Sequence, residues 1–250
     1  MIDQRLNAEL AANSALGLTR RRRVLESPCG RIAAVDGKNL LNFASNDYLG
    51  LAGNPEIAKA MADGAMHWGA GSGASHLVSG HLAPHEALEK EIAAFTSFPR
   101  ALTFSTGYLA NLAVTPTLAG RGDAVFADKL NHASLIDAMQ LAKANGADVQ
   151  RYPHNDVAAL KRLLAASTAR NKLIVTDGVF SMDGDLAPLP LLFDLAERYD
   201  AWLIIDDAHG FGVLGPHGIG SLGHFNLPAS KRILLMGTLG KAAGVGGAFV

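Results

Sequence analysis

The chain has 250 residues, enough for one large domain or two small ones, and 49% of them are hydrophobic, as expected for a folded globular protein. Its 22 basic and 23 acidic residues give a net charge of −1, which supplies no broad attraction for nucleic acid or anionic lipid. Cys29 is the only cysteine, so neither an internal disulfide nor a cysteine-based zinc site can form, and a reducing, cytoplasmic compartment is expected. The N-terminus lacks the continuous apolar run of a secretory signal, and no uncharged stretch is apolar enough to span a bilayer. We therefore expect neither nucleic acid nor a membrane as a partner.

An N-terminal arm of 45 residues is predicted ahead of the main domain. Ile2, Leu6 and Leu10 recur at helical spacing, and Gly17 would end a short amphipathic helix. The sequence RIAAV, Asp36-Gly37, NLLNF predicts a β-hairpin, because Asp-Gly accepts the positive φ values of a tight hairpin turn.

Residues 46–250 are predicted to form an α/β domain. Its apolar strand candidates are ALTFS, AVFAD, VQRY, KLIVT, AWLIID and RILLM. The helices expected between them span 111–118, 134–145, 156–166 and 190–199. Asn145-Gly146 would end the second of these helices and Asn155 would cap the third. This alternation predicts a largely parallel sheet with helices on both faces, so a ligand is expected at the carboxyl ends of the strands.

Polar residues follow several of these strands directly. Asp206 and His209 come after AWLII, and Lys241 lies between glycines after RILLM. Ser105 to Tyr108 could form a phosphate cradle at a helix start, and Asn131 to Ser134 brings another imidazole to the same edge. Each feature alone is explained as well by helix capping or a solvated loop. Their agreement on one edge of the sheet is what indicates a site.

The charge distribution and the chemistry of these groups favour an anionic, planar ligand. The residues after Asp207 carry three positive charges, on Lys231, Arg232 and Lys241, and no carboxylate. A partly desolvated lysine has the lowered pKa that Schiff-base chemistry requires. A phosphate cradle, a stacking histidine, an acidic residue and a lysine together suit pyridoxal 5′-phosphate, whose ring acts as an electron sink.

Three other patterns in the sequence indicate a ligand less strongly. Gly210 to Gly215 matches GxGxxG, but Pro216 and Gly218 prevent the helix that a dinucleotide site needs. His81 and His85 lack an acidic or sulfur partner for a metal, so we expect a structural or surface role and no metal. The run Arg20 to Arg23 is either a solvated charge cluster or a contact for a phosphate-bearing substrate.

Seven motifs, in order along the chain, resemble those of the α-oxoamine synthases, fold-type I enzymes that depend on pyridoxal phosphate. They are SNDYLGL (45–51), GSGASHLVSGH (71–81), STGYLAN (105–111), NHASLIDA (131–138), DGVFSMDGD (177–185), DDAHGFGVLG (206–215) and TLGKA (238–242). The resemblance implies the large domain of a fold-type I transferase, cut shortly after the lysine, with a C-terminal small domain missing. It also implies a homodimer.

The resemblance implies a role for each matching residue. The catalytic residues would be Lys241, His132, Asp206 and His209. Lys241 would be the Schiff-base lysine that moves the substrate α-proton, Asp206 would keep the pyridine nitrogen protonated, and His132 would stack on the ring and face the substrate. His209 and Ser181 would contact the phenolic oxygen.

The remaining implied contacts concern the phosphate and the substrates. Gly107, Tyr108 and Thr238 would bind the phosphate. Arg20 would meet the acyl substrate, and Asn46 would lie near the amino acid.

Within the family, the chain most resembles the members that condense L-alanine with a pimeloyl thioester, on coenzyme A or a carrier protein, in biotin biosynthesis. The resemblance implies that the carbanion formed from L-alanine attacks the thioester carbonyl, that the thiol leaves, and that the resulting β-keto acid then loses carbon dioxide. The alternatives are a sibling enzyme that uses glycine or serine with another acyl-CoA, and a catalytically silent fragment that acts as an assembly partner.

Overall fold

The computed structural model describes residues 2–250 and divides the chain into two compact units, Met1–Ser45 and Asn46–Val250. In the first unit, α1 (Ile2–Ala15) is followed by the antiparallel hairpin of β1 (Ile32–Val35) and β2 (Lys38–Leu41). Asp36 and Gly37 in the turn have φ values of 51° and 70°, the conformation that the sequence predicted for Asp-Gly. No side chain of α1 is buried, so the apolar positions of this predicted amphipathic helix lie exposed.

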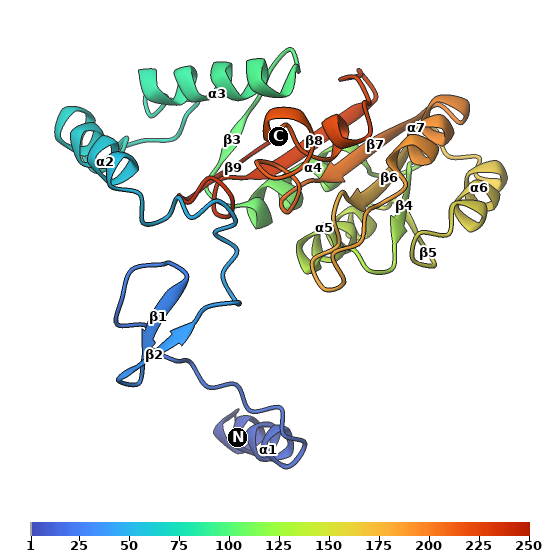
Figure 1. The fold of residues 1–250 in the computed structure, drawn as a ribbon. Coiled ribbons are helices and arrows are strands. Elements are labelled where there is room, and N and C mark those ends of the chain that lie inside the picture. Colours follow the sequence, from blue (N-terminus) through green and yellow to red (C-terminus); the bar gives the residue numbers. More distant parts are fainter. Residues whose placement is uncertain (1) are drawn as a thin grey trace. The chain divides into compact units, whose positions relative to one another are not determined.

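The second unit is built on a seven-stranded sheet (Figure 1). Five strands run parallel: β4 (Ala124–Asp128), β5 (Asp148–Tyr152), β6 (Lys172–Asp177), β7 (Ala201–Asp206) and β8 (Ile233–Thr238). The strand order is β3-β9-β8-β7-β6-β4-β5, and β9 (Ala248–Phe249) pairs antiparallel with both β8 and β3 (Thr103–Phe104). The prediction of a largely parallel α/β sheet is confirmed, with an antiparallel edge added by the last strand.

The helices of this unit are α2 (Pro55–Trp68), α3 (Ala83–Thr96), α4 (Gly107–Leu118), α5 (Ala133–Ala144), α6 (Val157–Ala166), α7 (Leu189–Arg198), the short η1 (Pro216–Gly218) and α8 (Ser221–His224). The four helices predicted between the strands are α4 to α7. Two further helices, α2 and α3, lie between residues 46 and 100, where the sequence analysis placed no element. The side chain of Asn54 caps α2, directly before Pro55 at its first position.

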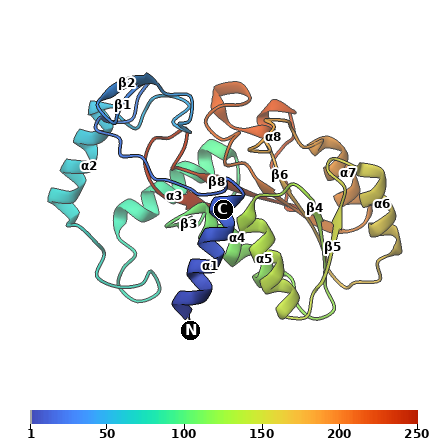
Figure 2. The ribbon, with the colours of Figure 1, turned by 90° about the horizontal axis from the view of Figure 1, so that it is seen from below.

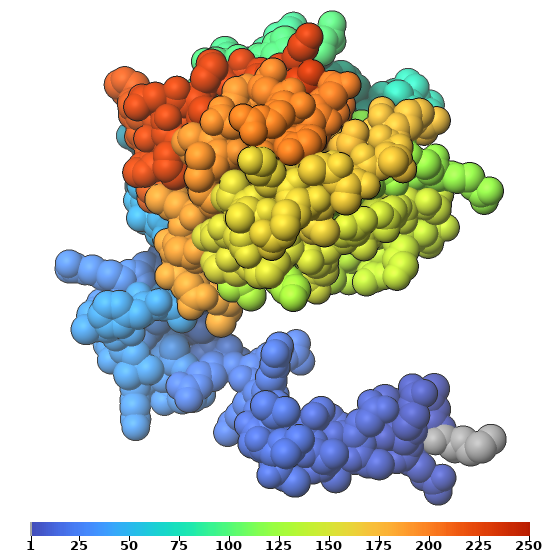
Figure 3. Space-filling view, turned by 90° about the vertical axis from the view of Figure 1, so that its right-hand side faces the viewer, coloured from blue at the N-terminus to red at the C-terminus, as the bar shows by residue number. Residues whose placement is uncertain are grey.

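The central strands β4 and β6 are buried on both faces, so neighbouring residues of one strand enter different parts of the core. Val125 packs with Leu135 of α5 on one face, where α4 and α5 lie side by side (Figure 2). Phe126 packs with Leu160 of α6 and Leu192 of α7 on the other face. These two helices, coloured yellow and orange, cover the sheet on the side turned to the viewer in Figure 3.

The predicted cap of α6 was wrong by one residue. The side chain of Asp156 accepts from the backbone N–H of Ala159, which makes Asp156 the N-cap. Asn155 has a φ of 54°, and its side-chain amide instead donates to Asp185 at 2.9 Å. Asparagine is one of the few residues that adopt this left-handed conformation readily, so Asn155 forms the turn before the helix.

No helix among the described residues 2–250 has both the length and the apolar character needed to cross a membrane.

Candidate active site

A cavity of about 180 Å³ lies where β6, β7 and β8 end, at the edge of the sheet expected for a ligand. Its lining residues are Gly107, Tyr108, His132, Ser134, Asp177, Asp206, Ala208, His209, Met236, Thr238 and Lys241. Seven of the predicted site residues are therefore brought to one cavity from four different segments of the chain. They are Gly107, Tyr108, His132, Asp206, His209, Thr238 and Lys241.

Lys241 is held in the loop that follows β8. Its amino group lies 2.7 Å from Nε2 of His209. Burial lowers the pKa of Lys241, while the carboxylates of Asp206 and Asp177 act in the opposite direction and raise it. The net shift is downward, which increases the fraction of neutral amine available as a nucleophile or base.

Asp206 and Asp177 form a buried pair of carboxyl groups at the ends of two neighbouring strands. Asp206 accepts from the side-chain amide of Asn111 at 2.7 Å and from the N–H of Ala208 at 3.1 Å, and Asp177 accepts from the N–H of His132 at 2.9 Å. Burial raises the pKa of both groups, and the Asp206 charge helps to raise that of Asp177 to about 8. Two such groups so close together favour a cation in the cavity.

Asp207, the neighbour of Asp206, belongs to a different network. It accepts from the N–H of Ser221 at 2.8 Å and from the Ser221 hydroxyl. A Cβ added at Gly210 or Gly220 would lie 2.2 Å and 2.1 Å from its carboxylate oxygens, so these glycines leave room for it. Burial raises the pKa of Asp207 to about 7. This carboxyl group fixes the loop after β7, whereas Asp206 lines the cavity.

His132 caps α5 and lines the cavity at the same time. Its Nδ1 accepts from the N–H of Ser134 at 3.2 Å and lies 2.7 Å from the Ser134 hydroxyl oxygen, which accepts from Asn111 at 2.9 Å. Because Nδ1 is an acceptor here, a neutral His132 carries its proton on Nε2. The capping bonds thus fix both the position and the tautomer of the ring.

The part of the cavity wall at the start of α4 is suited to an anion. Gly107 and Tyr108 are the first residues of α4, where backbone N–H groups have no partner within the helix. The helix dipole adds a partial positive charge at this end. The hydroxyl of Thr238 accepts from Gly240 and donates to the carbonyl of Gly247, which holds it beside this wall. Tyr108 itself donates to Asp137 at 2.5 Å.

The other predicted residues lie outside this cavity. Ser181 lines a neighbouring cavity of about 290 Å³, with Tyr48, His209 and several apolar side chains. Because His209 lines both cavities, Ser181 is near the site but does not line the cavity of Lys241. Asn46 accepts from the hydroxyl of Tyr48 at 3.2 Å. Arg20 is an exposed residue of the first unit, and its contact with an acyl substrate stays a prediction.

The sequence analysis missed four residues that organise the cavity: Asn111, Ser134, Asp177 and Tyr48. Asp177 directly follows the apolar run KLIVT, so the rule used for Asp206 could have found it. Asn111 and Ser134 lie inside helices, where no spacing distinguishes them from other polar residues. Tyr48 could be found only from the fold, since 161 residues separate it from His209.

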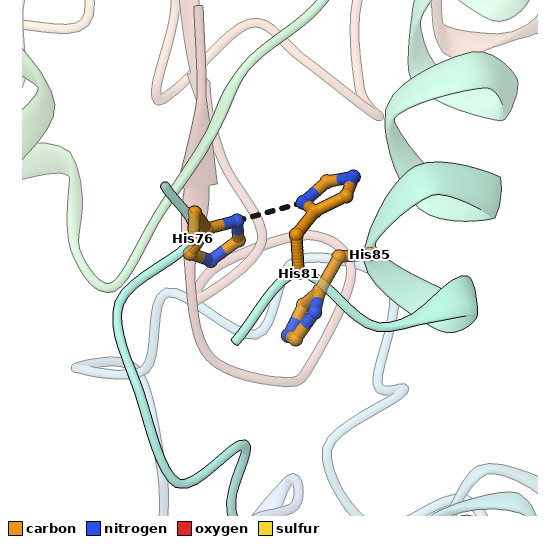
Figure 4. A group of neighbouring side chains, drawn as sticks. All are labelled: His76, His81 and His85. Carbon is orange, nitrogen blue, oxygen red and sulfur yellow. Dashed lines mark hydrogen bonds between the residues drawn. The ribbon is translucent and has the colours of Figure 1, made fainter. Parts of the chain in front are cut away.

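Three histidines outside the cavity, His76, His81 and His85, lie close together (Figure 4). Nδ1 of His76 lies 2.8 Å from Nδ1 of His81, and Nε2 of His81 lies 3.1 Å from Glu86. Nδ1 of His85 accepts from the N–H of Leu82 at 3.0 Å, at the start of α3. That bond occupies Nδ1 of His85 and gives this residue a structural role at the helix start, whereas Glu86 supplies His81 with the acidic partner that the sequence analysis did not find.

Residues 38–250 match the family model described as aminotransferase class I and II. The chain belongs to this family. A curated relative from Dechloromonas aromatica (strain RCB), an 8-amino-7-oxononanoate synthase, is 85% identical over 250 residues, which are 100% of this chain and 65% of the relative. A relative of the same name from Herminiimonas arsenicoxydans is 62% identical, over 100% of this chain and 64% of that protein. The chain thus spans about 65% of the length of the curated relatives it matches.

Two solved structures are also similar to this chain. Serine palmitoyltransferase from S. paucimobilis with a bound PLP–myriocin aldimine is similar with a TM-score of 0.88 and 31% identity, over 98% of this chain and 61% of that one. An 8-amino-7-oxononanoate synthase from Francisella tularensis has a TM-score of 0.69 and 34% identity, over 83% of this chain and 56% of that one. The fold is therefore that of the large domain of fold-type I enzymes, as the sequence predicted.

Proposed function

We propose that this protein is a pyridoxal phosphate-dependent acyltransferase that condenses L-alanine with a pimeloyl thioester, as an 8-amino-7-oxononanoate synthase. The products would be 8-amino-7-oxononanoate, carbon dioxide and the free thiol, a step of biotin biosynthesis. The observation that carries the proposal is Lys241, which lies in one cavity with Asp206, His132 and His209. The 85% identity with a relative of that name supports the choice of this member of the family.

The charges of the cavity fit the cofactor. Pyridoxal phosphate joins a ring that can be cationic at its nitrogen to an anionic phosphate. The buried carboxyl groups of Asp206 and Asp177 favour a cation, and the N-terminus of α4 at Gly107 favours an anion. Lys241 lines the same cavity and is the amine that would bind the cofactor covalently.

Each side chain of the cavity then has a task that follows from its surroundings. When bound, the cofactor supplies an electron sink for the negative charge that develops at the α-carbon of the amino acid. The amine of Lys241, its pKa lowered by burial, would accept the α-proton and return it. Asp206 would hold the proton of the ring nitrogen, and His132 would lie against the face of the ring. The Nε2 of His209 would orient the amine of Lys241 through its 2.7 Å contact.

The apolar cavity beside His209 is suited to the acyl chain of the thioester. Val179, Leu186, Val213 and Leu214 contribute to its lining. Removal of an acyl chain from water into such a cavity is favourable by about 0.8 kcal/mol per buried methylene.

Two further proposals concern the assembly and its compartment. Leu77, Val78 and Met66 are 100%, 79% and 89% exposed, and large apolar side chains at a surface are typical of contacts with another chain. This supports a homodimer, which sedimentation would detect as a doubled mass. The second proposal is a cytoplasmic location. The single cysteine, Cys29, forms no disulfide, as is usual in a cytoplasmic protein.

The test of the proposed function is the visible absorption spectrum of the protein with pyridoxal phosphate, for the parent and for Lys241→Ala. A new visible band in the parent alone, followed by borohydride reduction and a mass shift on the peptide that contains Lys241, would support it. Turnover would then be compared for alanine, glycine and serine with pimeloyl-CoA and pimeloyl-carrier protein. Turnover with glycine or serine and none with alanine would exclude this member of the family, and no modification of Lys241 would contradict the proposal as a whole.

A further inference from the structure

Tyr48 lies in a tight turn that its neighbours hold in place. The N–H of Gly50 donates to the carbonyl of Asp47 at 3.1 Å, and the carboxylate of Asp47 accepts from the N–H of Leu51 at 2.8 Å. Gly50 has a φ of 68°, a conformation that favours glycine. The backbone on both sides of Tyr48 is therefore fixed by local bonds.

The same turn is packed against the loop that carries Lys241. A Cβ added at Gly244 would lie only 2.4 Å from the N of Ala52 and 2.5 Å from the carbonyl carbon of Leu51. The N–H of Gly244 donates to the carbonyl of Lys241 at 2.9 Å. This close approach of two backbones sets the position of Tyr48 relative to Lys241.

The hydroxyl of Tyr48 completes a chain of hydrogen bonds that ends at Lys241. It lies 2.6 Å from Nδ1 of His209 and donates to Asn46 at 3.2 Å. Nε2 of His209 lies 2.7 Å from the amino group of Lys241. An ammonium group only donates, so Nε2 accepts from a charged Lys241, and the proton of the neutral ring is on Nδ1 and donates to Tyr48. One assignment of protons thus satisfies all three contacts.

The surroundings of His209 keep the ring neutral. Burial, and the nearby charges of Lys241 and His132, lower the pKa of His209 to about 4. A neutral imidazole has one donor and one acceptor nitrogen, so the partner of Nδ1 decides which of them faces Lys241.

We propose that Tyr48 is a positioning residue whose hydroxyl selects the tautomer of His209 and holds the ring so that Nε2 faces the amine of Lys241. Because the hydroxyl proton is donated to Asn46, the hydroxyl oxygen accepts from Nδ1, and this bond favours the tautomer of His209 that carries its proton on Nδ1. Phenylalanine at this position keeps the ring and loses both bonds. The inference rests on the proposed function for the role of Lys241, although the tautomer itself is a property of the chain alone.

The test is nitrogen NMR of the histidine rings in the 15N-labelled protein without cofactor, for the parent and for Tyr48→Phe. The parent is expected to show His209 protonated at Nδ1, and its signals are identified by their loss in His209→Asn. In Tyr48→Phe the ratio of the Nδ1-protonated to the Nε2-protonated form is expected to fall roughly three- to tenfold, the effect of one hydrogen bond. Tyr199→Phe, at the end of α7, is the matched control and should leave the ratio unchanged.

The outcomes separate this inference from the proposed function. An unchanged ratio in Tyr48→Phe, with the parent spectrum otherwise retained, would overturn the role of Tyr48 even if pyridoxal phosphate binds to Lys241. A changed ratio in a protein that does not bind pyridoxal phosphate would leave Tyr48 as the residue that sets the His209 tautomer and would overturn the proposed function instead.

Discussion

The side-chain amide of Asn111, in α4, donates a 2.7 Å hydrogen bond to the carboxylate of Asp206 at the end of β7. Both side chains are buried, with 2% and 3% of their surface exposed. A buried carboxylate without hydrogen-bond donors is costly in free energy, and among the described residues its other donor is the N–H of Ala208. The bond therefore links the helix that forms the anion-binding wall to the acidic wall of the same cavity.

Replacement of Asn111 by alanine is expected to destabilise the protein by about 1–3 kcal/mol, the cost of an unsatisfied buried acceptor. The loss should grow as the pH rises. Burial already raises the pKa of Asp206, so the folded protein loses stability as the pH rises from the usual pKa of an aspartate towards the raised pKa. Removal of the Asn111 amide takes away a donor to the carboxylate and raises the pKa of Asp206 further. Urea unfolding at pH 5 and pH 8 measures both effects. Asn145→Ala, at the exposed end of α5, is the control, and equal stability of the two variants would contradict the expectation.

The stability of the Asp207→Asn variant relative to the parent protein should increase as the pH rises. Burial raises the pKa of Asp207 to about 7, so the parent loses stability as the pH rises from about 4 through 7 because the buried group must ionise. Asparagine stays neutral, and its amide can still accept from the N–H of Ser221 and donate to its hydroxyl. We expect the stability difference between variant and parent to shift in favour of the variant by about 1–3 kcal/mol between pH 5 and pH 8.

Asp207→Ala provides the control for this substitution, because it removes the acceptor for both groups of Ser221. It should destabilise the protein at either pH. A difference between Asp207→Asn and the parent that stays constant with pH would show that Asp207 does not titrate in this range.

Much of this arrangement could be predicted from the sequence, and the reasons are local. Apolar runs such as AWLIID form strands because their side chains are buried on both faces, and residues directly after such runs, including Asp206, reach the ligand edge. The hairpin turn followed from Asp36 and Gly37 alone. In contrast, the contacts of Asn111 with Asp206 and of Tyr48 with His209 join residues 95 and 161 positions apart, and only the packing of the sheet brings them together.

The wrong prediction of Asn155 as the cap of α6 also arises from a contact between residues distant in the sequence. Asn and Asp both serve as helix caps, so the sequence Asn155-Asp156 leaves two possible registers. The amide of Asn155 bonds instead to Asp185, a residue of a distant loop, and this tertiary contact decides the register.

His154 is expected to stabilise the fold more at pH 6 than at pH 9. Its ring lies 3.0 Å from Asp128 and 2.8 Å from Asp185, which ties the loop after β6 to the end of β4. Burial lowers the pKa of His154, but the hydrogen bonds with Asp128 and Asp185 outweigh it, so the pKa is raised. The stabilisation is fully present below the usual value of about 6.5 and is lost as the pH rises through the raised value.

The corresponding experiment compares urea midpoints of His154→Gln and the parent across this range. The midpoint should fall at pH 6 and approach that of the parent by pH 9. His67→Gln, on the exposed surface of α2, controls for the general effect of a lost histidine. A deficit of His154→Gln that is the same at both pH values would contradict the role of the charged ring.

Gly244→Ala is expected to destabilise the protein and to weaken cofactor binding, because the loop of Lys241 and the turn of Tyr48 meet at Gly244. Its φ is 70°, and an added Cβ would lie 2.4 Å from the N of Ala52, so the two segments must separate. Strain and displacement together should cost on the order of 1–3 kcal/mol in urea unfolding. Gly246→Ala is a matched control two residues away, since its added Cβ would meet no atom within 4 Å. If Gly244→Ala bound pyridoxal phosphate as tightly as Gly246→Ala, the contact between the two segments would have no part in holding the site.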